Sequence, residues 1–103
     1  QFGPCVMFGL GGILAEAFRD TAFAMAPLSK ADALGLISRI RGQALLDGFR
    51  GMPAVDRDAL ADILVGLGDL GLAHPRIREI DVNPLLVGPD GMAAVDATIV
   101  LGN

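Results

Sequence analysis

The stretch that decides the fold is residues 77–101, IREIDVNPLLVGPDGMAAVDATIVL. Up to Pro84 it alternates between two kinds of side chain, the pattern of a β-strand with one apolar and one acidic face, and Leu85-Leu86-Val87 continue the strand. Gly88-Pro89-Asp90-Gly91 is a strong turn signal, because the fixed φ of proline suits its second position. Met92 to Leu101 then predicts the returning strand of an antiparallel hairpin. The alternation sets Ile77, Glu79, Asp81 and Asn83 against Arg78, Ile80, Val82 and Pro84.

This predicted hairpin brings oxygen-bearing side chains together. If Pro89-Asp90 form a two-residue loop, Asn83 lies opposite Asp96 with their Cβ atoms about 5 Å apart. Asp81 shares their face, because side chains alternate along a strand. A β-bulge would shift the register by one residue. Two carboxylates and an amide oxygen suit Mg²⁺ or Mn²⁺ on nucleotide phosphates; the alternative is an acidic, solvated sheet face.

A long helix is predicted just before the hairpin. It begins near Asp56, and either Asp56 or Asp58 can cap its first amide groups. Gly71 followed by Pro75 ends it. Its apolar stripe consists of Leu60, Ile63, Leu64, Leu67, Leu70 and Gly71.

A second helix fits Ser29 to about Arg41, because Ser29 is a good N-cap and Asp32 follows three residues later. The loop 47–53 separates the two helices. Residues 13–26 stay ambiguous from propensity alone: their alanines favour a helix, whereas the glycine-rich flank and Pro27 favour two short strands.

Composition narrows the class of protein. The chain has 103 residues, 52% of them hydrophobic, and a formal charge of −4, which predicts one small folded domain. No cluster of basic residues suggests binding to nucleic acid or to an anionic membrane. A single cysteine, Cys5, excludes an internal disulfide and fits a reducing, cytoplasmic compartment. The mean hydropathy of +0.55 and the start at Gln-Phe-Gly-Pro predict a piece of a larger protein.

Four other features of the sequence could carry chemistry. The glycines of residues 9–12 lack the Lys of a P-loop and the spacing of a dinucleotide fingerprint, so a tight turn or close strand packing is expected. His74 is expected at the C-terminal end of the long helix, and Cys5 in the core. Arg50 lies in the predicted loop, where it is either a ligand for phosphate or carboxylate or a solvated side chain.

At Asp81-Val82-Asn83-Pro84-Leu85, followed by Asp96, the sequence resembles the C-terminal part of an ATP-grasp domain. The resemblance is to NDP-forming acyl-CoA synthetases: the acetate–CoA ligase (ADP-forming) type and relatives of the succinyl-CoA synthetase β subunit. It implies that Asn83 and Asp96 are metal ligands, with Asp81 as a supporting acidic residue. The similarity extends over Phe2-Gly3-Pro4, residues 6–12, Glu16, Asp20, Ala22-Phe23, Pro27-Leu28, Gly48 and Arg50-Gly51.

The resemblance also implies a reaction and its cofactors. Acyl-CoA, ADP and phosphate would interconvert with the acid, CoA and ATP through an acyl phosphate and a phosphohistidine. That histidine lies outside this segment, so His74 is not assigned to it. The lid subdomain, with its phosphate-binding lysine, and the CoA-binding domains are also expected elsewhere. No catalysis is therefore expected from this chain alone, and Glu16 and Asp20 receive no role.

The fold class that follows is α+β: a mostly antiparallel sheet with two helices on one face, forming part of an ATP-grasp fold. Residues 1–103 are expected to form one domain, and the resemblance makes residues 13–26 sheet. The alternative function is a non-catalytic interaction or dimerisation module. Excess apolar surface predicts self-association through the first strand or through the stripe at Leu60, Ile63, Leu64 and Leu67.

Overall fold

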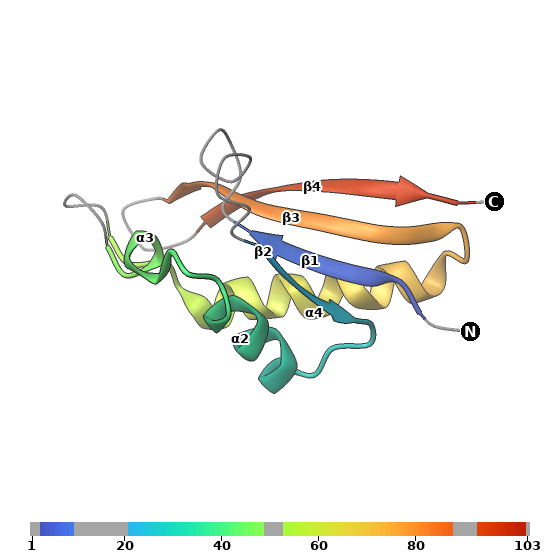
Figure 1. The fold of residues 1–103 in the computed structure, drawn as a ribbon, viewed down its shortest axis with the longest axis horizontal. Helices are drawn as coiled ribbons and strands as arrows, with labels where there is room; N and C mark the ends of the chain where they lie inside the picture. Colours follow the sequence, from blue (N-terminus) through green and yellow to red (C-terminus); the bar gives the residue numbers. More distant parts are fainter. Residues whose placement is uncertain (1–2, 10–20, 49–52, 88–92, 103) are drawn as a thin grey trace.

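A computed structural model describes residues 3–9, 21–48, 53–87 and 93–102. In this part of the chain, four strands form one sheet in the order β2-β1-β3-β4, and the helices lie together on one of its faces (Figure 1). The elements are β1 (Cys5–Gly9), β2 (Thr21–Met25), α2 (Lys30–Ser38), α3 (Gln43–Leu46), α4 (Arg57–Ala73), β3 (Ile77–Val87) and β4 (Ala93–Leu101). The α+β prediction is confirmed.

The sheet is mixed, so the prediction of a mostly antiparallel sheet is wrong. Strand β1 pairs antiparallel with β2 but parallel with β3, and β3 pairs antiparallel with β4. Parallel neighbours need a crossover connection, and the helices between β2 and β3 provide it. Helix α4 returns the chain to the end of the sheet where β1 begins, so β3 runs in the same direction as β1 (Figure 1).

The core lies between the sheet and helices α2 and α4. Its largest fully buried side chains come from both layers: Val6, Phe8, Ile80 and Val82 from the sheet, and Leu36, Ile37, Leu46, Leu60 and Leu64 from the helices. Removing this much apolar surface from water is the main force that stabilises the fold. The predicted stripe on α4 is confirmed at Leu60 and Leu64, whereas Leu70, at its far end, is exposed.

The helix caps follow the sequence signals. Ser29 Oγ accepts a hydrogen bond from the Asp32 amide at 3.0 Å, and the Asp32 carboxylate accepts one from the Ser29 amide, which completes the capping box. Asp56 caps α4 by accepting from the Ala59 amide at 3.0 Å. Helix α2 ends at Ser38, before the predicted Arg41. The Gln43 side chain donates hydrogen bonds to the carbonyl oxygens of Ile37, in the last turn of α2, and Ile40, just after the helix.

Gly71 does not end α4 as predicted. The helix runs on to Ala73, and His74 is its C-cap, as expected. Gly71 is buried where α4 touches the N-terminal segment: a Cβ there would lie 2.8 Å from Pro4 Cγ. The residue is glycine because the two segments approach closely, not because the helix stops.

The N-terminal third forms strands where it is described. Residues 21–25 form β2, as the resemblance implied, whereas residues 10–20 lie outside the described part. Cys5 is only half-buried, so its expected place in the core is wrong. The side chains of β1 alternate, and Val6 and Phe8 face the helices while Cys5 takes the other face.

Candidate functional site

The face of the sheet opposite the helices carries the candidate site. Along β3, the half-buried side chains of Glu79, Asp81 and Asn83 alternate with the buried Ile80 and Val82. Across the pairing with β4, they lie opposite Val100, Thr98 and Asp96. On the other side, Cys5 pairs with Glu79 and Met7 with Asp81. We call Glu79, Asp81 and Asn83 the acidic row.

The predicted register of the hairpin is confirmed at the site. Asn83 pairs with Asp96, so the amide and the carboxylate start from directly opposed Cα positions on the same face. The register shifts by one between Pro84 and Leu86, so the pairing nearer the turn departs from the simple two-residue loop. The turn itself, residues 88–92, lies outside the described part.

At the start of β3, a second irregularity makes the predicted assignment of side chains to the two faces wrong. The sequence pattern placed Ile77 on the acidic face, but Ile77 is buried with Ile80 and Val82. The register shifts between Ile77 and Glu79, and the extra residue, Arg78, reverses the alternation there.

Asp81 holds the most unusual polar atom of the site. Its Oδ1 is buried, and it has no hydrogen-bond partner within the described residues. A buried carboxylate oxygen without a partner is unfavourable, so it points to a group outside the described part of the chain. A cation or a donor on a bound ligand would satisfy it.

The neighbours of Asp81 respond to its charge. A hydrogen bond to the Asp81 carboxylate, followed by partial burial and the charge of Asp81, raises the pKa of Glu79. Burial, and then the charges of Glu79 and Asp81, raise the pKa of the Cys5 thiol. The row is therefore a region of crowded negative charge, which a cation would relieve.

Sequence reasoning found only part of this site. It singled out Asp81, Asn83 and Asp96, which the sheet brings onto one face. It did not single out Glu79 or Thr98, although two-residue periodicity already put Glu79 beside Asp81 on the acidic face. Arg50, the predicted phosphate or carboxylate ligand, lies outside the described residues, as do Glu16 and Asp20.

The donor set suits a hard cation that is shared with a ligand. Within the described ranges, no three His, Cys, Asp or Glu side chains gather closely enough to hold a metal by themselves. Asn83 and Asp96 contribute an amide oxygen and a carboxylate, the oxygen donors that Mg²⁺ accepts while it keeps other positions for water or phosphate. The residues thus fit a magnesium ion whose remaining ligands come from elsewhere.

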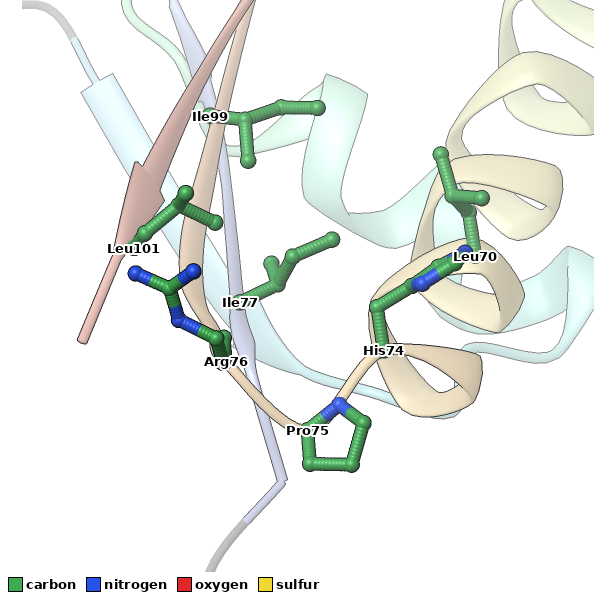
Figure 2. A pocket seen from close by; sticks show the side chains of 7 residues that line it. All are labelled: Leu70, His74, Pro75, Arg76, Ile77, Ile99 and Leu101. Carbon is green, nitrogen blue, oxygen red and sulfur yellow. The ribbon is translucent and has the colours of Figure 1, made fainter. Parts of the chain in front are cut away.

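Two hollows lie at the end of the sheet where β3 begins and β4 ends. One, of about 620 Å³, is mostly apolar and lies between the C-terminal end of α4 and the edge of the sheet. Figure 2 shows Leu70 and His74 on its helix side, Ile99 and Leu101 on its strand side, and Ile77 between them. The other hollow includes Cys5, Met25 and Arg78. Of the helices that the structure describes, none has the length and apolar character to cross a membrane.

Comparison with known proteins identifies the family. The model of the ATP-grasp domain matches residues 1–101. The chain belongs to the ATP-grasp family. The β subunit of ADP-forming acetate–CoA ligase I from Pyrococcus furiosus is 50% identical over 101 residues, which are 98% of this chain and 44% of that protein. The ADP-forming acetate–CoA ligase I of Archaeoglobus fulgidus is 40% identical over 102 residues, 99% of this chain but 15% of that protein.

A solved structure gives the same likeness. The dinucleotide-forming acetyl-coenzyme A synthetase 1 of Ca. Korarchaeum cryptofilum, in complex with coenzyme A and Mg-AMPPCP, matches with a TM-score of 0.79 and 45% identity. The match covers 98% of this ATP-grasp chain and 47% of that chain. The resemblance drawn from the sequence is confirmed. The chain spans less than half the length of these relatives.

Proposed function

We propose that this ATP-grasp chain forms the magnesium- and phosphate-binding part of the nucleotide site in an ADP-forming acyl-CoA synthetase. The observation that carries the proposal is the pairing of Asn83 with Asp96 beside Asp81, whose buried Oδ1 has no partner in the described part of the chain. The Mg-AMPPCP bound by the Korarchaeum relative supports the choice of metal and nucleotide.

Each residue of the site has a distinct task in this proposal. Asn83 and Asp96 would hold Mg²⁺, or Mn²⁺, through one oxygen each, from two strands whose pairing fixes their spacing. Asp81 adds negative charge next to them, and its buried Oδ1 has no partner in the described part of the chain. Magnesium supplies the neutralisation of charge on the phosphate oxygens of ATP or ADP, which is the main requirement of phosphoryl transfer.

The whole enzyme would interconvert acyl-CoA, ADP and phosphate with the acid, CoA and ATP. The first relatives are named for this class of ligase, and this chain covers less than half of each. The lid over the nucleotide, the CoA-binding domains and the phosphohistidine would come from the remaining parts. We therefore expect no turnover from the chain by itself.

Arg50 is proposed as a phosphate or carboxylate contact near the metal. A guanidinium offers two parallel donors to such a group, whereas an ammonium offers a point charge. In the full enzyme, Arg50→Lys would then be nearly as harmful as Arg50→Ala. Full activity in Arg50→Lys would argue for a solvated or point-charge role.

The test of the metal site is turnover of the full-length enzyme. Asn83→Ala or Asp96→Ala should lower kcat/KM by orders of magnitude, because each removes one oxygen ligand. The matched control is Asp69→Ala, since Asp69 is an exposed carboxylate on α4, away from the open face. Circular dichroism checks that each variant is folded. Near-normal turnover in folded Asn83→Ala or Asp96→Ala would reject the site.

A further inference from the structure

Strand β4 forms an outer edge of the sheet with nothing in the described part of the chain beyond it (Figure 1). The strand spans nine residues, and both register shifts of the hairpin fall on β3, so β4 is itself regular. Residues 97–101, Ala-Thr-Ile-Val-Leu, contain no charge and no proline. The exposed fractions of the last three side chains are 43% for Ile99, 43% for Val100 and 54% for Leu101.

Proteins normally protect an edge of this kind. The usual devices are short length, a charged side chain, a proline or a bulge, since an open edge offers unpaired backbone groups to another strand. The opposite edge strand, β2, has two of them: it is five residues long, and Pro27 follows it closely. Strand β4 is nine residues long, and its one charged side chain, Asp96, precedes the uncharged segment 97–101. The contrast selects β4 as the edge that another strand pairs with.

We propose that two copies of this chain pair edge to edge through β4, antiparallel and related by a two-fold axis at Ile99. The two four-stranded sheets then form one continuous sheet. This inference does not require a metal at the nucleotide site, although Asp96, a proposed ligand there, also lies at the seam.

A second copy fits because the edge is complementary to itself. A two-fold axis perpendicular to the sheet keeps each face aligned, so helix-side residues meet helix-side residues. With the axis at Ile99, that residue meets its own copy, Ala97 meets Leu101, and Thr98 meets Val100. Each of these cross-strand pairs includes at least one apolar side chain, and none includes a charge. Cross-strand pairs of this type stabilise a sheet.

Charge also favours this pairing in a chain whose net charge is −4. The same axis places Asp96 opposite Gly102, which has no side chain, so no carboxylates face each other across the seam. The Arg78 side chain lies across Gly102, in the space that a Cβ there would occupy. By the alternation of β4, a Cβ at residue 102 would lie on the open face with Asp96, so Arg78 lies on that face too. Asp96 of one copy therefore approaches the positive charge of the other.

The apolar hollow beside β4 adds to the argument. Ile99 and Leu101 form its strand side, and Figure 2 shows both side chains on the sheet edge, across from Leu70. In the paired dimer, Ile99 of the second copy continues this wall, so the exposed flanks of Ile99 and Leu101 become cross-strand contacts. The seam thus covers the largest exposed apolar side chains of β4.

Sedimentation velocity of the purified chain across the micromolar range tests the proposal. We expect a monomer–dimer equilibrium, and Ile99→Lys should raise its Kd at least about tenfold by placing two like charges at the axis. The matched control is Phe23→Lys, on the other edge strand, which should leave Kd unchanged. A monomeric wild-type chain, or a dimer lost in Phe23→Lys and retained in Ile99→Lys, would overturn the proposal.

Cross-linking tests the position of the axis directly. In a Cys5→Ser background, Ile99→Cys should form an intermolecular disulfide under mild oxidation, because the two copies of residue 99 face each other at the axis. Phe23→Cys in the same background should remain monomeric on a non-reducing gel. A dimer that cross-links through residue 23 and not through residue 99 would mean that another surface makes the contact. If the chain stays monomeric and instead binds an added amphipathic helical peptide at the hollow, the second copy is the wrong occupant.

Discussion

The two faces of the sheet come from the same alternating strands, yet they differ in what they bury. On the helix side, Val6, Phe8, Ile80 and Val82 are at most 1% exposed, and all four side chains are apolar. On the open side, the acidic row is half-buried and contains Asp81 Oδ1, a buried oxygen without a partner in the described chain. The covered face therefore provides stability, whereas the open face holds unfavourable groups in place, as the proposed metal site requires.

The largest expected effect is on the free energy of unfolding, and it differs between two phenylalanines, one on each face. Phe8 is fully buried on the covered face, whereas Phe23, on the open side of β2, is 59% exposed. Phe8→Ala should lower the free energy of unfolding by about 3–5 kcal/mol through lost burial and a cavity. Phe23→Ala should change it by less than about 1 kcal/mol. Urea unfolding at low protein concentration measures both, and equal losses would mean that the faces do not differ in this way.

The features of the two faces that depend on residues close together in the sequence could be predicted from the sequence. The alternation of β3 and the turn signal at residues 88–91 predict Asn83 opposite Asp96. The pairing nearer the turn is shifted by one residue, and the irregularity between Pro84 and Leu86 restores the predicted register at the site. The capping box at Ser29 and Asp32 also needs only four residues of sequence. These features depend on neighbours in the chain, which the sequence shows directly.

The features that the sequence did not predict depend on distant contacts. The parallel pairing of β1 with β3 is set by the path of α4, and Cys5 faces outward because Val6 and Phe8 take the covered side. The bulge at Arg78 moves Ile77 to the covered face, where it is buried. Of the residues expected to mediate self-association, Leu60, Leu64 and Phe8 are covered within the chain, whereas Ile63 and Leu67 are only partly buried; self-association itself stays a prediction.

Two glycines of α4, one exposed and one on the covered side, should show a smaller difference in stability when each is replaced by alanine. Gly66 has open space around it, so Gly66→Ala should raise stability by up to about 1 kcal/mol through helix propensity. Gly71 faces the covered side, where an added Cβ would lie 2.8 Å from Pro4 Cγ and 3.3 Å from Ile80 Cδ1. Gly71→Ala should lower stability by about 1–3 kcal/mol. The midpoints of thermal unfolding of the two variants measure this difference. If both substitutions stabilise the chain, Pro4 moves aside to make room for the added Cβ.

The smallest expected effect is electrostatic and confined to the open face. Cys5 sits beside Glu79 in the register of β1 with β3, and the pKa of its thiol is raised by burial first and by the charges of Glu79 and Asp81 next. Alkylation by iodoacetamide, which requires the thiolate, should therefore reach half its maximal rate at a higher pH than for an unhindered thiol. Glu79→Gln removes one negative charge and should move that midpoint down. The midpoint should stay above the ordinary value, because burial remains.

Two controls separate a local effect from the net charge of the chain. Asp69→Asn, on α4, should not move the midpoint. Added salt should reduce the difference that Glu79→Gln makes, since exposed charges are screened. If Asp69→Asn and Glu79→Gln shift the midpoint equally, Cys5 responds to the net charge of the chain and not to the acidic row.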